Sequence, residues 1–279
     1  MSVLIFVDQA DNHIKKSSFE ALTYGADVAK QLNTSAEALV LGTVDYDLAT
    51  LGKYGVTKVH QVVNESLNHV DAQVFAKVIA EAATASNASV IIFSHNQTGK
   101  AVAARVAARL KAGLVAGACA LPDISNGFTV KKTVFSGKAF ANIGIASSIK
   151  VISLNPNSYK TVATDGTAEV VALNIAVDAA KVKVAAVNKV SGEVPLTEAD
   201  IVVSGGRGLK GPENWGIILD LAKELGAATA CSRPVGDAHW RPHHEHVGQT
   251  GVQIAPNLYI AVGISGAIQH LAGVNRSKV

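Results

Sequence analysis

The sequence predicts an α/β protein in which helices cover a mostly parallel sheet. Short aliphatic runs alternate along the chain with segments of helical periodicity, as βαβ units require. Hydrophobic residues make up 48% of the 279 residues and aromatic residues only 5%, so the core is aliphatic. At 17%, charged residues are too few for a disordered chain or a coiled coil. The length predicts two domains, at about 150 residues each.

In the first half, four aliphatic runs predict buried strands with helices between them. The predicted strands are Val3–Asp8, Ser35–Leu41, Lys58–Val63 and Ser89–Ser94. The predicted helices are Ser17–Leu32, Asp71–Ala85 and Lys100–Leu110. After Gly113 the helix signals become sparse and the chain is predicted to be mainly β. Its runs are Thr129–Phe135, Ala139–Ile149, Val151–Leu154 and Glu169–Leu173.

A second αβ pattern begins at Asp200, after a predicted linker at Val187–Asp200 that contains Ser191, Gly192 and Pro195. We therefore predict domains at residues 1–190 and 191–279. The predicted strands of the second domain are Ile201–Val203, Ala227–Ala230 and Tyr259–Val262. The predicted helices are Pro212–Leu225, which ends at Gly226, and Ser265–Ala272, with Ser265 as N-cap. The buried face of the first helix is predicted to carry Trp215, Ile218, Leu219, Ala222 and Leu225.

Charge, cysteine content and hydropathy exclude several classes of protein. The formal net charge of +3 is too balanced for a nucleic-acid surface. Two cysteines, Cys119 and Cys231, are too few for a disulfide framework and fit a reducing compartment. The uncharged stretch from Val247 to Asn275 is broken by Pro256 and by glycines, which excludes a membrane span and favours a buried ligand pocket. Without a secretory or organellar leader, the expected location is bacterial cytoplasm rather than the mitochondrial matrix.

A glycine-rich loop follows the first strand of the second domain. Gly206–Gly211 matches G-x-G-x-x-G, and Arg207 and Lys210 add positive charge. Such a loop can bind a pyrophosphate with its backbone N–H groups, or it can be an ordinary strand-to-helix turn. The second strand ends at Ala230–Arg233 without the acidic residue that an NAD site places about 20 residues on.

Three further loops carry polar groups at predicted strand ends, where open α/β sheets bind ligands. If Arg233 is buried, Ser232 and Arg233 suit an electron-rich ring that becomes negatively charged on reduction. The simpler alternative is that Arg233 is a surface arginine at a turn. Val247–Gly251 offers an amide, a hydroxyl and close backbone approach, and Ser265–His270 offers a hydroxyl and N–H groups. Each loop alone could be an ordinary turn, but together they predict one pocket.

Metal binding and covalent catalysis are disfavoured. His239, His243, His244 and His246 have no zinc-site spacing, so a solvated loop is predicted there. Cys231 lies in an apolar run and is predicted to be a small core residue. No nucleophile motif or carboxylate pair is present.

Four segments together resemble the α subunit of electron transfer flavoprotein. They are Val203–Lys210, Ser232–Arg233, Val247–Gly251 and Ile254–Gly273, the last including Tyr259-Ile260-Ala261-Val262-Gly263-Ile264-Ser265-Gly266-Ala267-Ile268-Gln269-His270. The resemblance covers nearly the whole chain. The N-terminal half matches in organisation, including Ser94-His95-Asn96 followed by Gly99-Lys100.

The resemblance implies an N-terminal, mostly parallel, nucleotide-binding-like domain that contacts a β subunit, followed by a doubly wound FAD-binding domain. It implies that Arg207 holds phosphate or the flank of the flavin, and that Ser232 and Arg233 lie beside the isoalloxazine ring. Thr250 would bond near N5 with Gln249 beside it, in the segment Val247-Gly248-Gln249-Thr250. The pyrophosphate and ribitol of FAD would be contacted by Ser265, Gly266, Ala267, Ile268 and Gln269. His270 would lie near O2 of the flavin ring.

The implied function is electron carriage without substrate chemistry of its own. Electrons would come from flavin dehydrogenases, such as those acting on acyl-CoA, and pass to a quinone oxidoreductase. Alternatives are a subunit of an electron-bifurcating complex, an NAD-dependent oxidoreductase using Gly206–Gly211, and a nucleotide-binding module without a redox role. Family members extend past Val279, so the FAD domain is expected to be incomplete relative to the family, and FAD binding by this chain alone is expected to be weak or absent.

Overall fold

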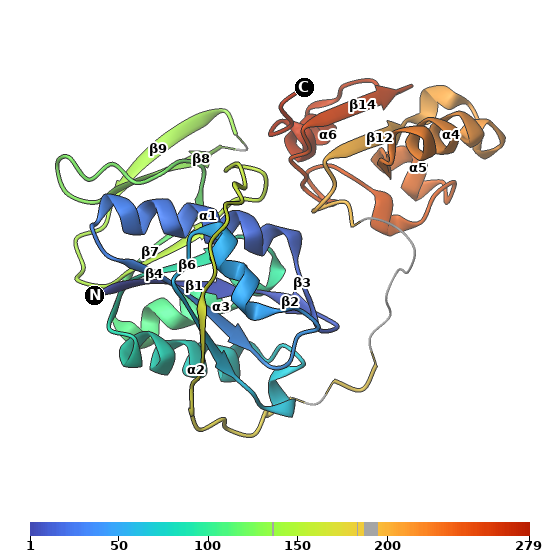
Figure 1. The fold of residues 1–279 in the computed structure, drawn as a ribbon. Coiled ribbons are helices and arrows are strands. Elements are labelled where there is room, and N and C mark those ends of the chain that lie inside the picture. The colour runs from blue at the N-terminus through green and yellow to red at the C-terminus, as the bar shows by residue number, and fades with distance from the viewer. Residues whose placement is uncertain (136, 183, 187–194) are drawn as a thin grey trace. The chain divides into compact units, whose positions relative to one another are not determined.

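The computed structural model describes residues 1–135, 137–182, 184–186 and 195–279 (Figure 1). The chain forms two compact units. The first comprises residues 1–133 and 140–187, and the second comprises residues 134–139 and 188–279. Most of the predicted linker Val187–Asp200 and the predicted boundary at residue 190 lie outside the described residues.

Within the described residues, the first unit contains a nine-stranded sheet in the order β11-β5-β4-β1-β6-β10-β7-β8-β9. Its strands are β1 (Ser2–Val7), β4 (Ser35–Leu41), β5 (Lys58–Val62), β6 (Ala88–Ser94), β7 (Gly113–Ala118), β8 (Thr129–Val134), β9 (Ala139–Gly144), β10 (Lys150–Leu154) and β11 (Glu169–Ala172). The pairs from β11 to β7 are parallel, and β8 is antiparallel to β7. This confirms the predicted α/β class. The structure adds β7, which was not predicted, and β9 ends at Gly144 rather than Ile149.

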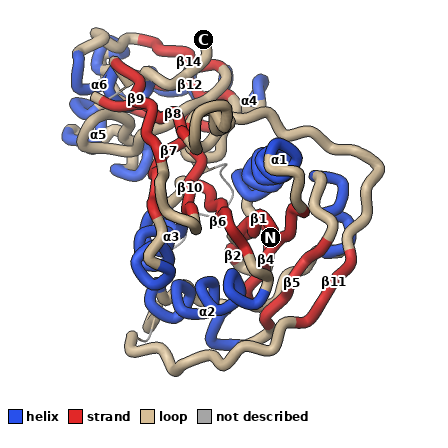
Figure 2. The backbone as a smooth tube through the Cα atoms, turned by 90° about the vertical axis from the view of Figure 1, so that its left-hand side faces the viewer, coloured by secondary structure: helices blue, strands red, loops and turns tan. Residues whose placement is uncertain are grey.

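Helices cover both faces of this sheet (Figure 2). Helix α1 (Lys16–Gln31) packs on one face, and α2 (Ala72–Ala85) and α3 (Gln97–Leu110) pack on the other. Alternate residues of β1 enter the two cores, so the strand is buried on both sides and reads as one unbroken aliphatic run. Short elements complete the unit: β2 (Gln9–Ala10), β3 (His13–Ile14), η1 (Leu48–Tyr54) and η2 (Glu65–Leu67).

In its described part, the second unit has a three-stranded parallel sheet in the order β13-β12-β14. The strands are β12 (Ile201–Gly205), β13 (Ala228–Cys231) and β14 (Leu258–Val262), and the helices are α4 (Gly216–Leu225), α5 (Arg233–Asp237) and α6 (Ile268–Val274). Single 3₁₀ turns lie at η3 (Arg207–Leu209), η4 (Pro212–Trp215) and η5 (His243–Glu245). One face packs on α4 and α5 through Val203, Trp215 and Val235, and the other packs on α6 through Val202 and Val274.

Two predictions about the helices of the second unit are wrong. The last helix begins at Ile268 and not at Ser265, and its N-cap, Ala267, makes no side-chain bond. Gly266 has φ +73°, a left-handed conformation that a helix cannot contain, so the helix can start only after it. Leu219 and Leu225 are 43% and 39% exposed, because the buried stripe of α4 is narrower than the predicted one.

The predicted end of α4 is confirmed. Gly226 follows the helix in the left-handed conformation, where the absence of a Cβ atom removes the steric cost. None of the helices in the described residues combines the length and the hydropathy that crossing a bilayer demands.

Candidate functional site

The candidate site lies at one edge of the small sheet in the second unit. Because β13, β12 and β14 are parallel, their carboxyl ends meet at the same edge. The loops that begin at Gly206, Ser232 and Gly263 therefore start side by side, as the sequence predicts. Open α/β sheets place ligands outside such an edge.

Glycines allow the first and third loops to touch through their backbones. Gly206 N–H donates to the Val262 carbonyl at 2.8 Å, and Gly208 N–H donates to the Gly263 carbonyl at 2.9 Å. A Cβ atom on Gly206 would lie 2.2 Å from the carbonyl oxygen of Gly263, closer than real Cβ contacts. The glycines of the G-x-G-x-x-G match thus serve loop-to-loop packing, a use that the motif alone does not reveal.

The Val247–Thr250 loop is bound to the same edge. Val247 N–H donates to the Cys231 carbonyl at 3.0 Å, which places the loop beside β13. Gln249 N–H donates to the Gln269 carbonyl at 2.7 Å, which ties the loop to α6. A Cβ on Gly273 would lie 2.5 Å from the Cα of Gly248, so a glycine is required at this approach. All four predicted loops therefore form one continuous backbone surface.

The candidate residues divide into a buried set and an exposed, mostly polar set. The buried ones are Ser232, Val247, Gly248 and His270. The exposed ones are Arg207, Arg233, Gln249, Thr250, Ser265, Gly266, Ala267, Ile268 and Gln269. A surface of this kind offers hydroxyl, amide and guanidinium groups over a fixed backbone.

Arg233 is not buried, contrary to the expectation for an arginine beside a flavin ring. Its side chain is 63% exposed, and its Nε donates to Oδ2 of Asp237 at 3.3 Å. Arg233 opens α5, which anchors to the core through Val235, and residues two apart do not share a helix face. In this chain Arg233 is a surface arginine at a turn, and a ligand at the edge would have to cover it.

A polar pair, formed by the half-buried Tyr259 and the buried His270, joins β14 to α6. The Tyr259 hydroxyl is 2.7 Å from Nε2 of His270. Burial raises the pKa of Tyr259 to about 12, so the hydroxyl keeps its proton. Burial lowers the pKa of His270, and the neighbouring His246 lowers it further, so this imidazole is neutral around pH 7. The sequence analysis did not single out Tyr259, since a tyrosine in an aliphatic strand resembles any other core residue.

The histidine-rich segment is only partly the solvated loop that was predicted. His239, His243 and His244 are exposed, but His246 is 3% exposed. Within the described ranges, no cluster of metal-ligating side chains is present. The segment is braced by Arg241, whose Nε donates to Oε2 of the buried Glu245 at 2.9 Å. The i, i+4 spacing of Arg241 and Glu245 is visible in the sequence and is typical of an ion pair.

Cys231 is fully buried at the end of β13, as predicted for a core residue. Burial raises its pKa to about 12, with the carboxylate of Glu245 adding to the effect. The thiol therefore stays protonated near neutral pH and is a poor nucleophile.

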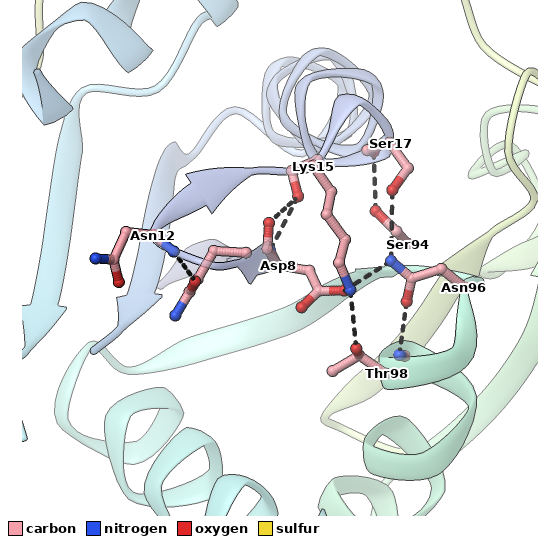
Figure 3. Close-up of polar contacts among 10 residues, drawn as sticks. Asp8, Asn12, Lys15, Ser17, Ser94, Asn96 and Thr98 are labelled. Atoms are coloured by element: carbon pink, nitrogen blue, oxygen red, sulfur yellow. Dashed lines mark hydrogen bonds and ion pairs between the residues drawn. The ribbon is translucent and has the colours of Figure 1, made fainter. Parts of the chain in front are cut away.

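A second possible site, in the first unit, is filled by the protein itself. The connections of β1 and β6 leave in opposite directions, and open α/β sheets bind ligands at the carboxyl ends of such strands. Figure 3 shows Asp8 there, bonded at Oδ2 to Lys15 Nζ at 2.7 Å and to Asn96 Nδ2 at 2.8 Å. Lys15 also reaches Thr98 Oγ1 at 3.3 Å. Because these groups bond to one another, we place the candidate site in the second unit.

Comparison with known proteins points to one family. Residues 3–180 match the electron transfer flavoprotein domain, and residues 195–275 match the electron transfer flavoprotein FAD-binding domain. The chain is 36% identical over 278 residues to the electron transfer flavoprotein subunit alpha of Syntrophomonas wolfei, covering 98% of this chain and 86% of that protein. It is 32% identical over 284 residues to protein FixB of Clostridium saccharobutylicum, covering 99% and 85%. It is 38% identical over 227 residues to the alpha subunit of Pseudomonas aeruginosa, covering 81% and 72%.

Proposed function

The chain belongs to the electron transfer flavoprotein alpha-subunit family, and from that premise we propose that it relays electrons from flavin dehydrogenases to a quinone oxidoreductase. Alpha subunits of this family pair with a beta subunit, and the match to the FAD-binding domain assigns FAD to the second unit. We further propose that the two subunits act as a heterodimer and that acyl-CoA dehydrogenases are among the donors. When bound, FAD supplies the isoalloxazine ring that accepts and releases electrons.

The observation that carries the proposal is the convergence of the four loops at one sheet edge. A dinucleotide cofactor needs backbone that it can approach closely, and the exposed Gly266, where an added Cβ would meet no atom within 4 Å, provides it beside exposed polar groups. The buried His246 also fits a cofactor site, because its Nδ1 has no hydrogen-bond partner among the described residues. The residues present therefore suit FAD.

For the individual residues we propose the roles that the family resemblance implies. Arg207 holds phosphate or the flank of the flavin, and Ser232 and Arg233 lie beside the ring. Thr250, with Gln249 next to it, bonds near N5, and His270 lies near O2. The pyrophosphate and ribitol contacts come from the segment after β14, in which Ser265, Gly266, Ala267, Ile268 and Gln269 are exposed.

Charge at the edge supports an electron carrier. Arg207 and Arg233 are exposed cations on neighbouring loops, and an arginine keeps its charge at any working pH. A fixed positive charge favours the negative charge that a flavin gains on reduction. Asp237 holds Arg233 in place at 3.3 Å in the free chain, and bringing the guanidinium onto the ring would loosen this exposed ion pair at little cost.

An NAD-dependent oxidoreductase is less well supported. The glycines that would admit a pyrophosphate, Gly206 and Gly208, are already packed against Gly263. The end of the second strand, Ala230–Arg233, lacks the acidic residue expected for the NAD ribose. A bifurcating complex remains the alternative within the family, and it would need a second flavin on the partner subunit.

The test is the visible absorption spectrum of the chain purified with and without its beta subunit, followed by reductive titration with dithionite. We expect flavin bands in the complex, and reoxidation of the reduced complex by a quinone oxidoreductase. Arg233→Met should make the bound flavin harder to reduce, whereas Lys223→Met, an exposed cation on α4, should not. A colourless complex would refute the proposal, and a coloured complex that no quinone oxidoreductase reoxidises would refute the acceptor.

A further inference from the structure

Two buried histidines flank the loop that carries Gln249 and Thr250. His246 is 3% exposed and His270 is 9% exposed. A Cβ atom on Gly248 would lie 3.5 Å from Nε2 of His246 and 3.7 Å from the Cα of His270, so Gly248 lies between them. The His246 ring therefore packs beside the backbone of this loop.

His246 has a ring nitrogen to spare. Its Nδ1 is buried and has no hydrogen-bond partner among the described residues. The Nδ1 of His270 is likewise buried without a hydrogen-bond partner among the described residues, but its Nε2 bonds the Tyr259 hydroxyl at 2.7 Å. Both rings therefore have a nitrogen that can take up a proton; His270 is tied to Tyr259, whereas the His246 ring packs beside Gly248 of the loop.

Charged and titratable groups face His246 from each neighbouring element. His243 in η5 is 5.6 Å away between ring centroids, Arg233 and Asp237 lie on α5, and His270 lies on α6. On β13, Cys231 pairs with His246, and burial keeps its thiol protonated. Burial lowers the pKa of His246, His243 and Arg233 lower it further, and Asp237 opposes them. The ring is therefore neutral around pH 7, and a new negative charge nearby would raise its pKa.

We propose that His246 is a positioning residue of the flavin site that holds the Gly248–Thr250 loop and takes up a proton when the flavin becomes negatively charged. The inference rests on the proposed function. The electron comes from the donor dehydrogenase, or from dithionite in a titration, and remains on the flavin. The proton comes from water and forms the second N–H bond of the imidazole, so the net charge of the site does not change.

The test is the midpoint potential of the flavin in the complex of the two subunits, measured between about pH 5.5 and about pH 8.5, the range around the ordinary histidine pKa. We expect the potential of the unmodified protein to fall as pH rises, because reduction takes up a proton. His246→Gln should lose this dependence, since an amide does not titrate. His243→Gln is the matched control, an exposed neighbour whose loss should leave the dependence in place.

A second measurement tests the proposal on the unmodified protein, in case the His246→Gln variant folds poorly or binds FAD poorly. Imidazole nitrogen resonances of the unmodified complex, recorded oxidised and reduced, should show one histidine becoming protonated on reduction. This resonance should persist in both His243→Gln and His270→Gln. A flavin-loaded His246→Gln complex with an unchanged pH dependence, or no histidine gaining a proton, would overturn this inference alone. A complex without flavin would overturn the proposed function and this inference with it.

Discussion

Gly206 is the position where a single added methyl group has the most predictable effect on the candidate site. Alanine there would place Cβ 2.2 Å from the carbonyl oxygen and 2.6 Å from the carbonyl carbon of Gly263. Both atoms are backbone, so they cannot turn away as the end of a side chain could. The loops after β12 and β14 must separate instead.

The cost follows from the contacts at this point. Forcing extra volume into a close-packed contact costs about 1–3 kcal/mol. Separating the loops also breaks the bonds from Gly206 to Val262 and from Gly208 to Gly263, at about 1 kcal/mol each. We expect Gly206→Ala to lower the free energy of unfolding of the second unit by about 3–5 kcal/mol and to reduce its FAD content.

Urea unfolding followed by tryptophan fluorescence measures this effect selectively, because both tryptophans, Trp215 and Trp240, lie in the second unit. The matched control is Gly216→Ala at the start of α4, where an added Cβ meets no atom within 4 Å. That change should be neutral or stabilise by about 0.5–1 kcal/mol, since alanine favours helix. Equal urea midpoints for the two variants, with equal FAD content, would refute the packing argument.

Three further predictions concern stability and reactivity. Lys15→Met should destabilise the first unit by about 3 kcal/mol, because it leaves the buried Asp8 carboxylate without its cation. Adding Asp8→Asn to the same chain should restore most of the lost stability. Urea unfolding followed by circular dichroism measures both variants, and no recovery in the double variant would contradict the ion-pair explanation. The second unit should lose stability as the pH falls below about 6.5. In the folded protein the pKa values of His246 and His270 are lowered, so the unfolded chain binds protons first. Tryptophan fluorescence measures the stability at each pH, and no change in stability from about pH 7 to about pH 5 would contradict this prediction. Cys231 should resist iodoacetamide at about pH 8 in the native protein and react in urea, since burial raises its pKa to about 12. Mass spectrometry identifies the modified thiol, and rapid labelling of the native protein would show that the Cys231 thiol is accessible to solvent.

Local sequence predicted most of the secondary structure. Ser35–Leu41 is a strand with the predicted bounds, because an aliphatic run buried on both faces identifies itself in sequence. Asp71 caps α2 by accepting from two backbone N–H groups, and Asn96 caps α3 by accepting from the Gly99 N–H alone. This cap starts α3 at Gln97, before the predicted Lys100.

The failures occur where distant contacts decide the structure. Ser265 has the chemistry of an N-cap, but the left-handed Gly266 moves the start of the helix to Ile268. Leu219 continues the apolar pattern of α4, yet the small sheet leaves it exposed. The exposure of Leu219 cannot be read from neighbouring residues, because it depends on which surface the sheet presents.

By itself, the sequence determined the fold class, the order of most strands and helices and the loops that carry polar groups, since periodicity and turn chemistry act over a few residues. The tertiary structure decided how those loops are joined. Only the parallel register of β12 and β14 shows that Gly206 must face Gly263, and only packing shows that His246 is buried beneath Gly248 while Arg233 lies on the surface. Burial and close backbone contact depend on residues far apart in the chain, and these set the pKa values and the shape of the site.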